Sequence, residues 1–322
     1  MNKIQKGNMA KLTVEYPNGG SDEFVHAYGM THYKKMLFPN RDLKLQIESI
    51  QELDIRDDDI YLATYPKCGT HWVWEILVML KRGNAEYETK TKEAAFLDFR
   101  SPEVVGSLPS PRILNCHYPC KLIPKEMLQK KTKIVHVMRN PKDAFVSFYH
   151  HSNTMLGGMF SKSFQDFLPL MLGQHGVYLY YPWFKYVKEW ERFSKQHPEQ
   201  ILNLFFEDLK EVFIKLQYEP RHDVYLNRPV REIKRINDFL GTGRSEELLQ
   251  QIAESCDFKN MKKADAEIKE YDEKMKKQMP LMYRKGEVGD WKNIFTVAQN
   301  EQIDEWIEEN LIDTDLKFRY TL

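Results

Sequence analysis

The sequence predicts an α/β fold in which a parallel β-sheet is covered by helices on both faces. Four short apolar runs, at residues 60–64, 113–115, 134–138 and 201–206, alternate with longer stretches of helical periodicity. Runs that are apolar throughout are typical of parallel strands buried on both sides. One helix start is well marked, because Asn140 can cap a helix that has Pro141 at its first position and Asp143 in its first turn. A chain of 322 residues with 42% apolar content can bury one large core, so we expect a single domain.

Composition and charge exclude several classes of protein. The 47 basic and 47 acidic residues cancel, so no overall field favours nucleic acid or an anionic membrane as a partner. The longest apolar stretch, 72–80, is far shorter than the roughly 20 residues of a membrane span and contains Glu75. The polar segment 1–11 lacks the apolar centre of a signal peptide. We therefore expect a cytoplasmic protein that has neither nucleic acid nor a membrane as a partner.

The four cysteines are Cys68, Cys116, Cys120 and Cys256, and they form no dense disulfide framework, which suits a reducing compartment. The run from Cys116 through His117 to Cys120 lacks a fourth ligand at a suitable spacing, so we expect no metal site. On their own, Cys120 and Cys256 are most simply interpreted as small buried side chains.

A segment suited to anion binding lies between the first predicted strand and the apolar helix that follows it. It reads Tyr65-Pro66-Lys67-Cys68-Gly69-Thr70-His71. At such a turn the free N–H groups of the first helical residues and the positive end of the helix dipole converge, and Lys67 adds a point charge. The loop is not an ordinary P-loop, because its lysine precedes the glycine, so a nucleotide kinase fits poorly.

Three motifs together resemble a known family. The loop is similar to Tyr-Pro-Lys-Ser-Gly-Thr-Thr-Trp, and the run from Arg284 to Lys292 to Arg-Lys-Gly-x-x-Gly-Asp-Trp-Lys. The third motif is Arg139-Asn140-Pro141-Lys142-Asp143 with Ser147 downstream. Their order and spacing agree over residues 57–306, so the chain is identified as a member of the cytosolic sulfotransferase family, which uses 3′-phosphoadenosine 5′-phosphosulfate (PAPS). The resemblance implies a sulfotransferase domain over residues 46–322, and the segment 1–45 stays undefined.

The resemblance also implies roles for individual residues. Lys67 would bind the leaving 5′-phosphate, cradled by Gly69 and Thr70, and His117 would be the catalytic base in an in-line transfer. The remaining residues implied in the donor site are Cys68, His71, Trp72, Arg139, Ser147, Phe206, Cys256, Phe258, Arg284, Lys285 and Gly286. Among these, Arg139, Ser147, Arg284, Lys285 and Gly286 would hold the 3′-phosphate, and Trp72 and Phe258 would stack on adenine.

Two of these roles have alternatives. A single histidine beside a strand end is by itself more often structural, and only the resemblance favours His117 as a base. Arg139 could instead form an ion pair with Asp143 or with a carboxylate elsewhere.

On the acceptor side, the resemblance points to Phe96, Phe99, Asn115 and His151. We expect a hydroxyl or an amine on a small apolar acceptor, with His151 making the pocket more polar. Phe96 and Phe99 could equally be ordinary core residues. The sequence does not rank phenols, steroids, iodothyronines and amines.

The chain departs from the family pattern at five places. Cys68 and His71 replace hydroxyl residues, Asn115 replaces a lysine, Phe206 replaces a tyrosine, and residues 212–228 form an insertion that suggests an altered splice product. Because Lys67 and His117 remain, we expect a slower enzyme. A catalytically weak or inactive protein that binds PAPS or its product PAP (3′,5′-adenosine bisphosphate) is the alternative.

Lys292, Thr296, Val297 and Glu301 match the family's dimerisation motif, Lys-x-x-x-Thr-Val-x-x-x-Glu. The resemblance therefore implies a homodimer with a small two-fold contact. A solvated loop and helix start is the alternative.

Overall fold

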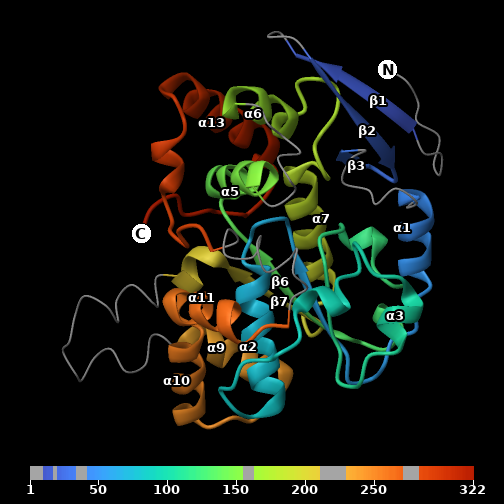
Figure 1. Ribbon diagram of the computed structural model, residues 1–322, viewed down its shortest axis with the longest axis vertical. Helices are drawn as coiled ribbons and strands as arrows, with labels where there is room; N and C mark the ends of the chain where they lie inside the picture. The colour runs from blue at the N-terminus through green and yellow to red at the C-terminus, as the bar shows by residue number, and fades with distance from the viewer. Residues whose placement is uncertain (1–9, 17–19, 34–41, 155–162, 211–229, 271–282) are drawn as a thin grey trace.

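A four-stranded parallel sheet forms the centre of the protein (Figure 1). The computed structural model describes residues 10–16, 20–33, 42–154, 163–210, 230–270 and 283–322. The strands are β4 (Ile60–Thr64), β5 (Ile113–Cys116), β6 (Lys133–Met138) and β7 (Ile201–Phe205), in the order β5-β4-β6-β7. These are the four apolar runs of the sequence, so the α/β prediction is confirmed. The insertion at 212–228 lies outside the described residues.

Alternate residues of β4 enter two separate hydrophobic clusters, one on each face of the sheet. Ile60 and Leu62 pack with α2 (Thr70–Arg82), α9 (Val230–Leu240) and α10 (Glu246–Ser255). Tyr61 and Ala63 pack on the opposite face, in the cluster that includes residues of α5 (Pro141–Thr154) and α7 (Trp183–Gln196). Because successive side chains of a strand point to opposite faces, a strand covered on both sides must be apolar throughout.

The other helices complete the two layers. They are α1 (Leu43–Gln51), α3 (Pro102–Gly106), α4 (Glu126–Gln129), α6 (Phe164–Leu172), α11 (Phe258–Glu267) and α13 (Val297–Leu311), with 3₁₀ turns η2 (Lys92–Ala95), η3 (Cys120–Leu122) and η5 (Asp290–Asn293). In Figure 1, α2, α9, α10 and α11 lie together, and α5, α6 and α13 form a separate group. No helix among the described residues is long and apolar enough to cross a membrane.

The N-terminal segment, for which the sequence suggested no structure, contains a second sheet. It is an antiparallel meander of β1 (Ala10–Glu15), β2 (Ser21–Ala27) and β3 (Met30–Tyr33). Phe24 and Met30 belong to the same cluster as Tyr61, and Thr31 pairs with Tyr180 through two backbone hydrogen bonds. The segment is thereby attached to the residues that precede α7.

The helix start predicted at Asn140 is confirmed. The side chain of Asn140 accepts a hydrogen bond from the Asp143 backbone N–H at 2.9 Å, and Pro141 is the first residue of α5. The Asn140 backbone N–H itself donates to Glu207 Oε1 at 2.9 Å. This cap directs the chain away from the sheet immediately after β6, so Arg139 lies at the carboxyl edge of the sheet, where ligands of such sheets bind.

Candidate active site

The loop between β4 and α2 has a backbone shape that depends on two unusual residues. Gly69, the N-cap of α2, has φ 99°, and Lys67 has φ 67°, in the left-handed region that side chains disfavour. A Cβ on Gly69 would lie 3.0 Å from Phe206 Cδ2, so a larger residue would have to displace that ring. Arg139 Nη1 donates to the Lys67 carbonyl at 3.1 Å and so supports the loop. The strained position at Lys67 is consistent with a functional loop.

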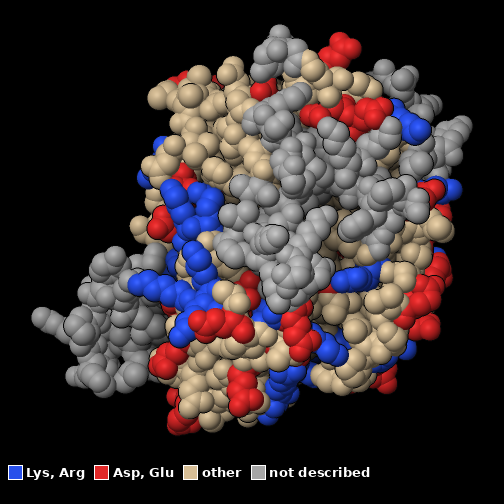
Figure 2. Space-filling model, in the orientation of Figure 1, with Lys and Arg blue, Asp and Glu red and all other residues tan. Residues whose placement is uncertain are grey.

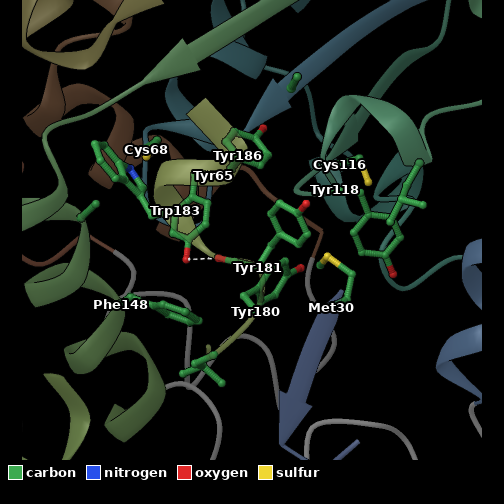
Figure 3. Packing of buried hydrophobic residues seen from close by; sticks show 14 of the residues in the cluster. Met30, Tyr65, Cys68, Cys116, Tyr118, Phe148, Tyr180, Tyr181, Trp183 and Tyr186 are labelled. Atoms are coloured by element: carbon green, nitrogen blue, oxygen red, sulfur yellow. Dashed lines mark hydrogen bonds between the residues drawn. The ribbon is translucent and has the colours of Figure 1, made fainter. Parts of the chain in front are cut away.

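Cys68 is the residue of this loop whose side chain packs into the hydrophobic core. Its side chain is fully buried, and Figure 3 shows it in a cluster with Tyr65, Trp183 and Tyr186. Tyr65 Oη donates to the Tyr181 carbonyl at 2.9 Å, which ties the loop to the residues before α7. Burial raises the pKa of the Cys68 thiol well above its usual value. The thiol is therefore a neutral core group.

Positive side chains converge on Lys67. Burial, and after it the nearby charges of Lys92, Arg139 and Arg284, lower the pKa of Lys67 to about 7. A lysine whose charge is disfavoured in the free protein regains it when an anion binds beside it. In Figure 2, Lys and Arg side chains gather on the left of the view, between the places where Figure 1 shows α11 and α13. A chain whose formal net charge is zero therefore carries a local group of positive side chains on this part of its surface.

His117 follows β5 and is oriented by Thr64, the last residue of β4. His117 Nδ1 lies 2.8 Å from the Thr64 carbonyl oxygen and 3.0 Å from Thr64 Oγ1. A carbonyl oxygen only accepts, so we assign the ring proton to Nδ1, and Nε2 keeps its lone pair. Thr64 Oγ1 also lies 2.7 Å from Thr70 Oγ1, so one hydroxyl pair joins the histidine to the anion loop.

The surroundings of His117 keep its ring neutral. Burial lowers the pKa of His117 to about 4, aided by the charges of Lys92 and Lys67 and opposed by Asp98. Asp98 accepts the His117 backbone N–H at 3.0 Å and also accepts the Tyr180 hydroxyl. Sequence reasoning missed Thr64 and Asp98. The only sequence signals were that Thr64 ends a predicted strand and that Asp98 lies between Phe96 and Phe99.

Arg139 connects the loop at Lys67 to the segment 284–292, which carries the other predicted cations. Arg139 Nη2 donates to the Glu287 carbonyl at 2.9 Å, while its Nη1 binds the Lys67 carbonyl, so the guanidinium spans both segments. Its Cζ lies 4.1 Å from the centre of the Phe206 ring. Among the described residues Arg139 forms no ion pair, so the alternative pairing with Asp143 is wrong.

Asp143 instead positions the segment that carries the other cations. It accepts the backbone N–H groups of Gly289 at 2.8 Å and Trp291 at 3.1 Å. Within the segment, Arg284 Nη1 lies 2.6 Å from Asp290 Oδ2, and Lys285 pairs with the other oxygen of Asp290. Although burial opposes ionisation, hydrogen bonds from Lys285, Asn293 and Arg284 hold the pKa of Asp290 at about 2.

Ser147 lies half-buried on α5, in the helix that starts beside Arg139. Its part in holding the 3′-phosphate stays a prediction.

The aromatic residues predicted for adenine lie near the loop. Trp72 meets Phe206 edge to face, with ring centres 5.4 Å apart. Phe258 packs against Gly286, where a Cβ would lie 2.3 Å from Phe258 Cδ2 and where φ is 66°. Cys256 is fully buried, with Sγ 3.8 Å from Met79 Sδ in the core. Its place in cofactor binding, like adenine stacking, stays a prediction.

Of the predicted acceptor residues, Phe96 lies beside His117, and Phe99 lies beside Phe96. The Phe96 ring centre is 4.9 Å from that of His117 and 5.1 Å from that of Phe99, both edge to face. Asn115, by contrast, is fully buried, and its Nδ2 donates to the Lys92 carbonyl at 2.9 Å. His151 lies near the end of α5, where burial lowers its pKa well below the usual value.

His71 introduces two residues that sequence reasoning missed. Its Nε2 lies 3.1 Å from Glu93 Oε1, and the same oxygen lies 3.2 Å from Lys92 Nζ. Burial, and then the charge of Lys92, lowers the pKa of His71 to about 4. In the sequence Lys92 and Glu93 look like two more charged residues in a polar stretch, so nothing there distinguishes them.

Comparison with known proteins decides the family. A sequence model described as a sulfotransferase domain matches residues 57–315. Sulfotransferase 1A1 of Rattus norvegicus is 34% identical over 294 residues, which cover 86% of this chain and 92% of that protein. Sulfotransferase 1E1 of Homo sapiens is 33% identical over 313 residues, covering 92% and 96%. The chain belongs to the cytosolic sulfotransferase family. The resemblance inferred from the three motifs is thus confirmed, and the chain is an enzyme of this class.

Solved structures agree with this assignment. Mouse sulfotransferase SULT7A1, crystallised with PAP, is 26% identical to this sulfotransferase with a TM-score of 0.69, over 94% of this chain and 95% of its own. Retinol dehydratase, in a complex with retinol and PAP, has a TM-score of 0.71 over 97% and 99% of the two chains. At 20% identity the second comparison supports the fold alone.

Proposed function

We propose that this sulfotransferase moves the sulfonate group of PAPS to a hydroxyl or amine on a small apolar acceptor, with His117 as the base. The observation that supports this most strongly is the orientation of His117. Its Nδ1–H is held by the Thr64 carbonyl, and Thr64 in turn contacts Thr70 at the start of α2. A proton acceptor and an anion-binding loop are therefore built on the same pair of strand ends.

The positive groups suit a donor with two separate phosphates. Lys67 and the first residues of α2 would form one anion-binding site, and Arg139 with Arg284 would form the other. Arg139 contacts the backbone of both segments, so it sets the spacing between the two sites. That mouse SULT7A1 was crystallised with PAP supports the same donor here.

The residues present can support an in-line transfer. When bound, the donor supplies an activated sulfonate on a phosphate leaving group. His117 Nε2 takes the proton of the acceptor oxygen or nitrogen as that atom bonds to sulfur. Lys67, charged again beside the phosphate, stabilises the negative charge that develops on the leaving oxygen. Thr70 lies close enough to Thr64 to couple this loop to the base.

The acceptor site follows from the side chains around His117. Phe96 and Phe99 offer aromatic surface, and His71 and His151 stay neutral because burial lowers the pKa of each. A flat apolar molecule with one nucleophilic hydroxyl or amine fits such surroundings. The family also supports a cytoplasmic location as part of this proposal.

Homodimer formation is part of the proposal as well. Lys292, Thr296, Val297 and Glu301 are all exposed, and Val297 keeps 76% of its side-chain surface accessible. An apolar residue this exposed at the start of a capped helix suits a small two-fold contact.

Transfer of radiolabelled sulfonate to a panel of phenols, alcohols and amines tests the proposed function. The parent protein should label at least one acceptor, while Lys67→Ala and His117→Ala should each lose most of the activity. His175→Ala, at an exposed histidine, is the matched control. Activity that survives both site substitutions refutes the assigned roles. Tight PAP binding by calorimetry without transfer to any acceptor favours the inactive-binder alternative.

A further inference from the structure

Lys92 is a charged residue that the site described above does not account for. It is the first residue of η2, and only 4% of its side chain is accessible. Burying a lysine costs free energy that a single ion pair often fails to recover. A buried lysine at the edge of an active site therefore calls for a functional explanation.

Two contacts of the Lys92 ammonium lead toward the anion loop and toward the base, and a third contact holds the Lys92 backbone. On one side the ammonium lies 3.2 Å from Glu93 Oε1, the atom that also contacts His71 Nε2 on the first turn of α2. On the other side it lies 4.0 Å from the centre of the Phe96 ring, and Phe96 contacts the His117 ring. The backbone of Lys92 is held by Asn115, two residues before His117.

The charge of Lys92 acts on the groups that carry the chemistry. After burial, it is the largest influence that lowers the pKa of Lys67, ahead of Arg139 and Arg284. It also lowers the pKa of His117, where Asp98 acts in the opposite direction. The charge of Lys92 therefore disfavours charge on both the loop lysine and the candidate base.

We propose that Lys92 is a further catalytic residue, whose ammonium contacts the sulfonate while it passes from the donor to the acceptor. In this step the acceptor atom bonds to sulfur and gives its proton to His117. The bond from sulfur to the bridging oxygen breaks, and its electron pair stays on the phosphate beside Lys67. Lys92 balances negative charge on the other oxygens of the sulfonate, while Glu93 and His71 hold its side chain in place.

This role rests on the proposed function, so the experiment reads transfer and binding separately. Lys92→Met keeps most of the length of the side chain and removes its charge. We expect kcat to fall by about 10- to 100-fold. The Kd for PAP, measured at pH 6 where Lys67 is charged in both proteins, should stay unchanged within about twofold, because PAP lacks the sulfonate. Lys92→Arg should retain more activity than Lys92→Met. Lys90→Met, at an exposed lysine two residues earlier, is the control.

The pH profile of kcat/KM gives a readout that a merely structural lysine would not move. Removing the Lys92 charge should raise the pKa of both His117 and Lys67, so both limbs of the profile should move to higher pH. The remaining charged groups that act on these two, Asp98, Arg139 and Arg284, are unchanged in the variant. Unmoved limbs would contradict the placement of Lys92.

Lys92→Met also leaves Glu93 without its lysine, so the double variant Lys92→Met/Glu93→Gln is measured beside it. A double variant that regains parental kcat would show that the stranded carboxylate caused the loss, and would overturn the proposal. Unchanged kcat in Lys92→Met, or a Kd for PAP that rises in step with the loss, would overturn it too. If neither Lys92→Met nor the double variant folds, Lys92 serves only to stabilise the fold, and the proposal is overturned. A parent protein that binds PAP but labels no acceptor refutes the proposed function itself.

Discussion

Binding of PAP should draw a proton from solution onto Lys67. In the free protein burial and three neighbouring cations lower the pKa of Lys67 to about 7. At pH 8 only about 10% of this lysine is then charged, and a phosphate dianion beside it restores the charge. We therefore expect an uptake of about 0.9 proton per site at pH 8. His117 and His71, each with a pKa of about 4, stay neutral at this pH.

Calorimetry in two buffers of different ionisation enthalpy, both at pH 8, measures this uptake. At that pH the phosphates of PAP are already fully ionised, since their second pKa lies near 6. Lys67→Met should bind PAP more weakly and take up almost no proton. An uptake near zero in the parent, or an undiminished uptake in Lys67→Met, would refute the lowered pKa of Lys67.

The same lysine should affect stability without ligand. Between pH 7 and its usual pKa of 10.5, Lys67 binds more protons in the unfolded chain than in the folded protein, so its contribution raises stability as pH rises. Lys67→Met should lack this rise and should melt at a higher temperature than the parent at pH 6, where the buried charge is present. Thermal melts of both proteins at pH 6 and pH 9 would show the difference. The same change in melting temperature between the two pH values in both proteins would contradict the prediction.

Two further predictions concern the phosphate site and the dimer. Gly286→Ala should weaken PAP binding about tenfold or more, because the new Cβ would overlap Phe258 and the residue has φ 66°. Gly106→Ala is the control, because a Cβ there meets no atom within 4 Å. Equal Kd values for the two variants would contradict the prediction. Val297→Glu should halve the mass seen by light scattering, because charge would enter an apolar two-fold contact; an unchanged mass defeats the dimer.

Local patterns in the chain were enough for the sheet and for two of the helix starts. Each of the four strands is a short, mainly apolar run, so composition carried most of the signal. Strands β4 and β5 are buried throughout, whereas β7 is half-buried at three of its five positions. Helix starts at Gly69 and Asn140 follow from residues beside them in sequence. The N-terminal meander was harder to foresee, because β1 is mostly exposed or half-buried and depends on β2 for its pairing.

The sequence by itself determined that the candidate residues meet: Lys67 after β4, His117 after β5 and Arg139 after β6 lie at the carboxyl ends of parallel strands, at one edge of the sheet. Only the tertiary structure decided how their chemistry is tuned. The Thr64 carbonyl that orients His117 and the inward turn of the Cys68 thiol depend on atoms brought together by the fold. So does the buried charge of Lys92. Burial, more than any charge, sets the pKa of Lys67 and of His117, and burial is a property of the packed protein that no stretch of sequence contains.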